Sequence, residues 1–195
     1  FFTQTPPNPM LRSLVGSEMC IRDRPGDLVY LSGRIGGAAA ALYSAEGYAD
    51  PVLYRALCWP QPRTELGIAL GGIASSAVDV SDGLMADLDH ILSASGGLGA
   101  DVEADSLPLF ESAVTLLGRP RALELALGGG DDYELCFTAP KNRHQEVLEM
   151  GHRLGQELYQ IGQITERGGC RIRGSELDLD AVLPGYRHAW PRSKI

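Results

Sequence analysis

The stretch AVDVSDGLMADLDHI, residues 77–91, contains four aspartates within a segment that otherwise resembles a buried core. Its first residues are typical of a β-strand, and apolar side chains then recur at helical spacing after Gly83. The stretch therefore predicts a strand that turns directly into a helix. Asp79 and Ser81 are two positions apart at the strand end, so their side chains point to the same side.

These aspartates have two possible uses at the predicted junction. Asp82 lies where the chain enters the helix, and its carboxylate could cap the free N–H groups there. A strand end followed by a helix N-terminus is also a common phosphate site. Two carboxylates suit such a site if a magnesium ion lies between them and the phosphate, since magnesium binds both kinds of oxygen. The residues alone leave both uses open, and we expect Asp87 and Asp89 on the solvated face of the helix.

A second acidic segment, GGGDDYEL, spans residues 128–135. Its three glycines permit a close backbone approach to a ligand, but they also suit an ordinary helix-to-strand connection. Asp131 and Asp132 could cap, coordinate a metal or face water. The segment LPGYRHAW, residues 183–190, contains aromatic side chains that could stack on a planar ligand or close the core. Spacing does not separate these possibilities.

The remaining pattern predicts strands and helices in mixed order. A strand over residues 26–33 leads through Gly36 and Gly37 into an alanine-rich helix, and we expect these glycines to pack the helix on the sheet rather than to bind phosphate. Further helices are expected near residues 66–70, over 109–127 with a break near Pro120, and over 142–155. Strands are expected within 96–109 and 128–140, and a closing hairpin within 158–179. This order predicts an α/β (α+β) fold, a mixed sheet covered by helices.

Composition excludes several classes of protein. The formal net charge of −8 argues against nucleic-acid binding. No run approaches the roughly 18 apolar residues of a membrane-spanning helix, so we expect no membrane association. The four cysteines form no CxxC pair, which favours a reduced, cytoplasmic protein.

The first 24 residues differ from the rest, since they show neither helical nor strand periodicity. The part LRSLVGSEMCIRDR looks like translated sequencing-adapter read-through, and a natural disordered extension is the alternative. We therefore expect residues 1–24 to be a non-native or disordered leader and residues 25–195 to form the folded domain.

From about Pro25 onward, the chain resembles the C-terminal domain of the thiamine-monophosphate kinase family. The resemblance rests on PGDLVYLSGRIGGAAAAL, SSAVDVSDGLMADLDHI, ADVEADSLPL, GGGDDYELCFTAP and LPGYRHAW, in this order. That family belongs to a superfamily of ATP-using enzymes that includes aminoimidazole ribonucleotide synthetase. The resemblance implies phosphoryl transfer from ATP to thiamine monophosphate, several Mg2+ ions and a homodimeric parent enzyme.

Carried over by motif, Asp79 and Asp82 would bind magnesium, and Ser81 would contact ATP. Asp131 and Tyr186 would contact the thiamine substrate, and no residue of this chain is assigned a catalytic role. Asp131 stands where the family has glutamate, and the family's acidic N-terminal domain is missing, which implies a fragment that is inactive alone. The alternatives are another member of the superfamily, of the selenophosphate synthetase or hydrogenase-maturation type, and a non-catalytic isolated domain.

Overall fold

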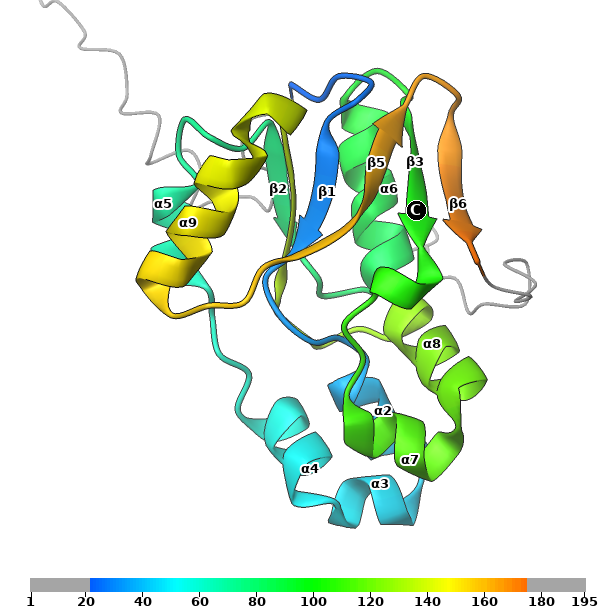
Figure 1. The fold of residues 1–195 in the computed structure, drawn as a ribbon. Coiled ribbons are helices and arrows are strands. Elements are labelled where there is room, and N and C mark those ends of the chain that lie inside the picture. The colour runs from blue at the N-terminus through cyan, green and yellow to red at the C-terminus, as the bar shows by residue number, and fades with distance from the viewer. Residues whose placement is uncertain (1–21, 175–195) are drawn as a thin grey trace, which may run out of the picture.

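A computed structural model describes residues 22–174, and six strands of this part form one mixed sheet in the order β2-β4-β1-β5-β3-β6 (Figure 1). Neighbouring strands are antiparallel except β3 and β6, which are parallel. The strands are β1 (Leu28–Leu31), β2 (Ser76–Asp79), β3 (Gly99–Glu103), β4 (Leu135–Ala139), β5 (Tyr159–Thr165) and β6 (Gly169–Arg173).

Helices cover both faces of the half of the sheet formed by β1, β2 and β4. On one face, α5 and α9 pack over Tyr30 and Phe137; on the other, α6 packs over Leu31 and Cys136. This double burial explains why β1 is an apolar run without alternation. The helices are α2 (Gly37–Tyr43), α3 (Ala45–Ala49), α4 (Pro51–Cys58), α5 (Thr64–Ala69), α6 (Leu84–Ala94), α7 (Glu111–Leu117), α8 (Arg119–Gly128) and α9 (His144–Leu154).

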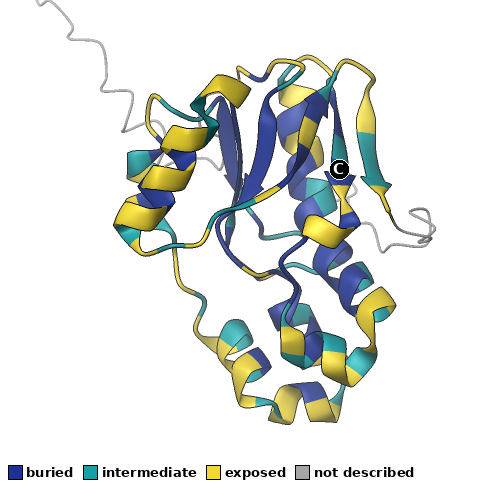
Figure 2. Cartoon of the chain, in the orientation of Figure 1, coloured by how far each residue is buried: buried dark blue, intermediate teal, exposed yellow. Residues whose placement is uncertain are grey.

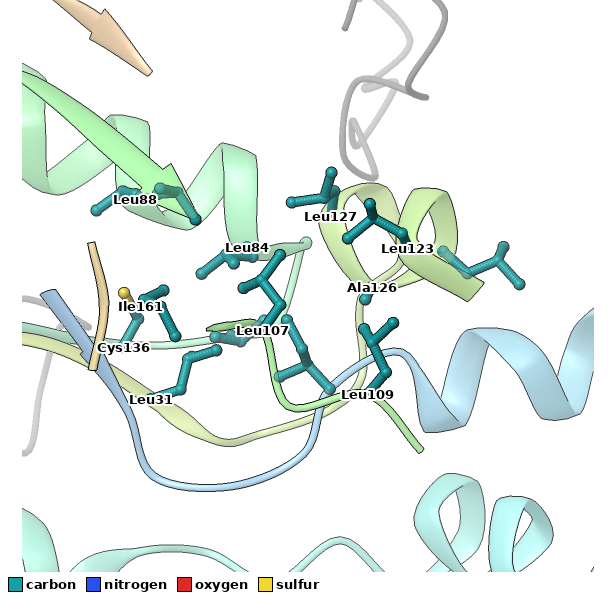
Figure 3. Close-up of a cluster of buried hydrophobic side chains, with 14 of the residues drawn as sticks. Leu31, Leu84, Leu88, Leu107, Leu109, Leu123, Ala126, Leu127, Cys136 and Ile161 are labelled. Carbon is teal, nitrogen blue, oxygen red and sulfur yellow. The ribbon is translucent and has the colours of Figure 1, made fainter. Parts of the chain in front are cut away.

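The larger apolar cluster contains side chains of the sheet together with side chains of α6 and α8. Figure 3 shows Leu84 and Leu88 of α6 beside Leu31 and Cys136 of the sheet. Figure 2 shows that the central strands are buried, whereas the outer faces of the helices are exposed. The mixed sheet covered by helices confirms the predicted fold class.

A group of helices, α2, α3, α4 and α7, lies beyond one end of the sheet (Figure 1). Helix α4 was not predicted from the sequence. Its start is nevertheless marked in the sequence, because Asp50 accepts hydrogen bonds from the N–H groups of Val52 and Leu53, and Pro51 occupies the first turn. Pro120 likewise lies in the first turn of α8 and separates it from α7, as predicted.

The predicted closing hairpin is wrong, because β5 and β6 do not pair. Strand β3 lies between them, antiparallel to β5 and parallel to β6. The connection from β5 to β6 crosses the start of β3 at Gly99, where an added Cβ would lie 1.9 Å from the carbonyl oxygen of Arg167. Only a residue without a side chain leaves room for this crossing.

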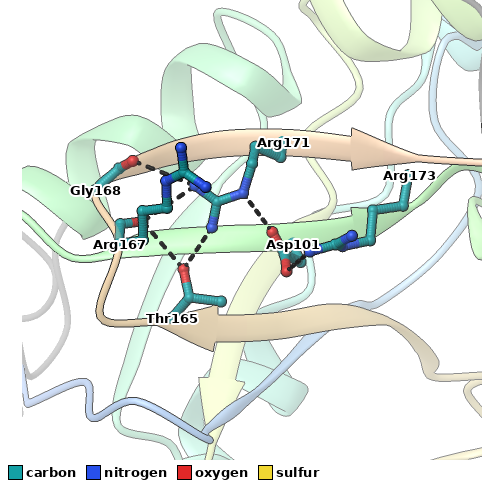
Figure 4. A network of polar contacts seen from close by, with 6 residues as sticks. All are labelled: Asp101, Thr165, Arg167, Gly168, Arg171 and Arg173. Atoms are coloured by element: carbon teal, nitrogen blue, oxygen red, sulfur yellow. Dashed lines mark hydrogen bonds and ion pairs between the residues drawn. The ribbon is translucent and has the colours of Figure 1, made fainter.

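Charged side chains fix the position of β6 beside β3. The carboxylate of Asp101 accepts hydrogen bonds from Arg171 Nε at 2.7 Å and from an Arg173 terminal nitrogen at 2.6 Å (Figure 4). Arg171 also donates to Thr165 Oγ1 on β5 at 2.9 Å. One carboxylate of the inserted strand therefore pairs with two arginines of the edge strand.

The boundary of the folded domain lies earlier than the predicted Pro25. The backbone N–H of Arg22 donates to the carbonyl of Ser75 at 3.2 Å, and the buried carboxylate of Asp23 accepts from the hydroxyls of Ser76 at 2.8 Å and Ser95 at 2.5 Å. Residues 22–24 are therefore packed against the domain, and the prediction that the leader is non-native stays a prediction for them. Residues 1–21 lie outside the described part, and the prediction for them stays a prediction. Every helix within residues 22–174 is too short or too polar to cross a membrane.

Candidate active site

The two acidic segments lie side by side, because the pairing of β2 with β4 continues beyond both strands. Asp79 is opposite Leu135 in the register of the pair. The backbone N–H of Val80 then donates to the carbonyl of Glu134 at 2.7 Å, and the N–H of Asp131 donates to the carbonyl of Ser81 at 3.0 Å. Long-range pairing therefore brings Asp79, Ser81 and Asp131 to the same edge of the molecule.

Glycines make this contact possible. At Gly130 an added Cβ would lie 2.1 Å from the carbonyl oxygen of Ser81. Gly83 has φ of 115°, and a Cβ there would lie 3.0 Å from the backbone of Gly128. The glycines in both motifs thus serve a close approach of two backbones.

Asp87 is buried, which contradicts the prediction of a surface position. It is 2% exposed, and its Oδ2 accepts hydrogen bonds from the N–H groups of Ser81, Asp82 and Gly83 at 2.9, 3.0 and 3.2 Å. Position 87 follows the buried Leu84 by three residues, so it lies on the same helix face. Asp89 is exposed, as predicted. Burial raises the pKa of Asp87, while the three N–H donors oppose that rise.

These bonds bear on the two uses left open for Asp82. Helix α6 begins after Gly83, and no side chain caps it. The capping interpretation of Asp82 is therefore wrong. The N–H groups of Ser81, Asp82 and Gly83, which precede the helix, are bound by Asp87 and are not open to a phosphate. Asp79, Ser81 and Asp82 are half-buried.

The carboxylate of Asp132 lies at the start of α2, beside the glycine turn that offered a weak phosphate-loop signal. It accepts from the N–H groups of Gly36 at 2.7 Å and Gly37 at 3.2 Å. A Cβ at Gly36 would lie 2.9 Å from the Cα of Ala126 in α8. These glycines do allow close packing, but against α8 and Phe110 rather than against the sheet, so the expected contact of helix with sheet is wrong. Burial raises the pKa of Asp132 to about 7.

Glu134 is the second buried acid of this segment, and the sequence did not predict it as a site residue. It accepts two hydrogen bonds from Arg63, from Nε at 2.8 Å and from a terminal nitrogen at 2.6 Å. The Ser32 hydroxyl donates to the same carboxylate at 2.5 Å. The signal in the sequence was alternation, because Asp132 and Glu134 are two apart and both point inward.

Asp131 and Tyr133 point outward from the same segment. Both are exposed, and the Tyr133 hydroxyl donates to Asp131 Oδ1 at 3.2 Å. The charge of Asp131 raises the pKa of Tyr133, and the charges of Asp79 and Asp82 add to this effect. The negative charge of these three carboxylates therefore acts on Tyr133. Tyr186, the remaining predicted site residue, lies outside the described residues.

Comparison with protein families identifies the domain that carries these residues. The family described as AIR synthase related protein, C-terminal domain, matches residues 24–175. The chain belongs to this family.

Relatives of this AIR synthase related C-terminal domain include kinases. The thiamine-monophosphate kinase of Haemophilus influenzae is 43% identical over 150 residues, which are 74% of this chain and 45% of that protein. The crystal structure of thiamine-monophosphate kinase from Stenotrophomonas maltophilia has a TM-score of 0.71 at 39% identity, covering 79% of this chain and 52% of that one. AaThiL complexed with AMPPCP and TMP has a TM-score of 0.67 at 27% identity, covering 86% and 52%. The chain spans about half the length of the curated relatives it matches.

Asp79 and Asp82 are the candidate metal ligands of this AIR synthase related domain. Among residues 22–174, no three His, Cys, Asp or Glu side chains converge as metal ligands. Asp79 and Asp82 nevertheless fit magnesium, which typically takes one or two carboxylates and completes its shell with water and phosphate oxygens. The described residues can thus supply part of a magnesium–phosphate site.

Proposed function

We propose that this domain forms the C-terminal half of a thiamine-monophosphate kinase. Such an enzyme transfers the γ-phosphoryl group of ATP to thiamine monophosphate and yields thiamine diphosphate and ADP. One observation carries the proposal: the half-buried Asp79–Asp82 loop lies beside the exposed Asp131, as the backbone bond between Asp131 and Ser81 requires. Relatives that carry this name match most of the chain, and AaThiL complexed with AMPPCP and TMP supports binding of both substrates.

The residues divide into a phosphate side and a substrate side. Asp79 and Asp82 would hold Mg2+, which neutralises the charge of the phosphates when it is bound. Ser81 lies between them and contacts ATP through its hydroxyl. Asp131 and Tyr186 contact thiamine monophosphate, with Asp131 one methylene shorter than the family's glutamate. Asp87 positions the whole loop from within the core.

The domain works with a second, acidic N-terminal domain in this proposal. Two carboxylates hold few ions, and the transfer brings several negative charges together, so the remaining metal ligands come from that second domain. The parent enzyme is a homodimer, as the resemblance implies. The free thiols of Cys58, Cys136 and Cys170 support a cytoplasmic location.

The test joins the N-terminal half of the Haemophilus influenzae relative to this chain before Arg22. Purified fusion protein is incubated with ATP, magnesium and thiamine monophosphate, and thiamine diphosphate is followed by chromatography. We expect turnover by the fusion protein and none by the chain alone, because orientation of the substrates contributes roughly 7–11 kcal/mol in favourable cases.

Variants of the fusion protein test the assigned residues. Asp79→Asn and Asp82→Asn should each lower turnover at least 100-fold, since a lost metal ligand weakens charge stabilisation in the transition state. Asp89→Asn, an exposed aspartate on α6, is the matched control and should keep full activity. A folded fusion protein that forms no product would refute the proposed kinase activity. Sustained product from the chain alone would refute the proposal that it supplies only half of the site.

A further inference from the structure

Strand β6 forms one edge of the described sheet. Its inner side pairs with β3, and within residues 22–174 no strand lies along its outer side. An open strand edge presents N–H and C=O groups that can pair with another strand, and proteins usually cover such an edge. The outer side of β6 is therefore a surface that a further strand can fill.

The side chains of β6 alternate between two unlike faces. Cys170 and Ile172 are half-buried and pack against the larger apolar cluster. Arg171 and Arg173 point to the opposite face, where both bind Asp101 (Figure 4). Both arginines remain partly open to solvent, with side chains that are 31% and 56% exposed. A strand that fits this edge must therefore carry apolar side chains beside the first face and acidic side chains beside the second.

The chain itself continues from β6 with such a segment. Residues 176–180 have the sequence ELDLD, in which acidic and apolar side chains alternate with the period of a β-strand. Gly174 and Ser175 separate this segment from β6. Gly174 has φ of 72°, and a glycine with positive φ at the first position of a two-residue turn is typical of a tight β-hairpin. The sequence after β6 thus suits a return strand along its outer edge.

We propose that residues 176–180 form a further strand, which pairs antiparallel with the outer edge of β6. A two-residue turn fixes the register of such a pair. It places Leu177 opposite Ile172. Two positions further along, Leu179 lies opposite Cys170. Both leucines then extend the apolar cluster on the face that α6 covers, and they shield the half-buried side chains of β6.

The same register places acidic side chains beside the arginines. Glu176 lies opposite Arg173, and Asp178 lies opposite Arg171. The register of β3 and β6 already puts an acid on the inner side of each arginine. Each arginine then lies between two carboxylates, and opposite charges on neighbouring strands stabilise a sheet. A shift by one residue would instead put a leucine opposite each arginine and an acid on the apolar face.

A second copy of the chain fits this edge poorly. Antiparallel pairing of two β6 strands about Arg171 or Ile172 would place arginines opposite each other, and like charges in that position destabilise a sheet. The attached segment carries the opposite charge. Because it is covalently joined to β6, its effective concentration at the edge is also high.

The test is disulfide trapping with the native thiol of Cys170. Leu179→Cys places a second thiol opposite it, and paired residues of antiparallel strands lie within the Cα separation that a disulfide needs. The full chain with Cys20→Ser and Cys58→Ser is oxidised in air with a copper catalyst, digested with trypsin and analysed by mass spectrometry. Trypsin cleaves after both arginines of β6, so the two thiols stay in one product only through the disulfide. We expect most of the protein to carry this bond within one chain.

Two controls test the register. Asp178→Cys and Asp180→Cys each lie one position from Leu179 and face the opposite side of the strand, so we expect a roughly tenfold lower yield of the bond to Cys170. The chain without substitutions gives a second measurement, which needs no variant. Its NMR spectrum should show a contact between the Hα atoms of Ile172 and Leu177, because these residues form a closely spaced pair.

Several outcomes would overturn the proposed strand. Free thiols in oxidised Leu179→Cys would show that residue 179 does not lie beside Cys170. Equal yields in the three cysteine variants would show a segment without a fixed register. Disulfide-linked dimers would place the segment of one copy on the edge of another. Absence of the Hα contact between Ile172 and Leu177 in the unaltered chain would refute the pairing as well.

Discussion

The carboxylate of Asp87 accepts a hydrogen bond from the backbone N–H of Asp82 at 3.0 Å, so a buried acid shapes the loop that carries a half-buried one. The same oxygen accepts from the N–H groups of Ser81 and Gly83. Because Asp87 satisfies the backbone of the loop, the side chains of Asp79 and Asp82 are not needed for that purpose. Within this motif, Asp87 therefore has a structural role, whereas Asp79 and Asp82 are not needed to hold the loop.

Replacement of Asp87 by alanine should destabilise the protein. Three N–H groups would lose a charged acceptor, and hydrogen bonds to charged groups contribute about 1.5–3 kcal/mol. We expect the free energy of unfolding, measured by urea denaturation, to fall by about 3 kcal/mol. Asp89→Ala on the exposed side of α6 should change it by less than about 0.5 kcal/mol. Equal losses in the two variants would show that Asp87 does not organise the loop.

The case of Asp87 also shows what local pattern can and cannot predict. The strand and helix of residues 77–91 follow from apolar periodicity, which is a local property, and the structure confirms both. The prediction places Asp87 with Asp89 on or near the face opposite the apolar stripe, although Asp87 is three residues from Leu84 and four from Ile91 and so lies on the buried face. A carboxylate is tolerated there because three N–H groups bind it.

Pairing between distant strands could not be predicted from the sequence. A short turn between β5 and β6 predicts a hairpin, but β3, which ends more than fifty residues before β5 begins, lies between them. The relevant signals, Gly99 at the crossing and Asp101 opposite Arg171, acquire meaning only once the register is known. The contact between Asp131 and Ser81 belongs to the same class, so motif resemblance, rather than spacing, brought both acidic segments into one predicted site.

The ion pair of Arg63 and Glu134 should be strongly coupled. Their side chains are 24% and 10% exposed, and two hydrogen bonds join them. Arg63→Met would leave a mostly buried carboxylate without its cation, which typically costs about 3–5 kcal/mol. The double variant Arg63→Met, Glu134→Gln should recover part of this loss, since no unpaired charge remains.

A double-mutant cycle measures that coupling from urea denaturation of the four proteins. The surface pair of Arg143 and Glu146 at the start of α9 is the matched control, and we expect a coupling below about 1 kcal/mol there. If both pairs gave the same small coupling, Glu134 would not anchor the 131–134 segment through Arg63.

Asp132 should make stability depend on pH in a direction opposite to that of most carboxylates. Burial raises its pKa from 3.8 to about 7 in the folded protein, so the folded state binds this proton more tightly than the unfolded state does. The stabilising contribution is fully present below about pH 4 and is lost as the pH rises toward 7.

Asp132→Asn keeps a carbonyl acceptor for the N–H of Gly36 but cannot ionise. Between pH 4.5 and 7.5 we therefore expect the free energy of unfolding to fall less in this variant than in the wild type. The difference should be a few kcal/mol, since one pKa unit corresponds to about 1.4 kcal/mol. Urea denaturation at pH 4.5, 6.0 and 7.5 gives the comparison, with the exposed Asp131→Asn as control. Parallel pH profiles for wild type and Asp132→Asn would mean that Asp132 ionises at its ordinary pKa, and that the start of α2 stabilises its charge enough to cancel the cost of burial.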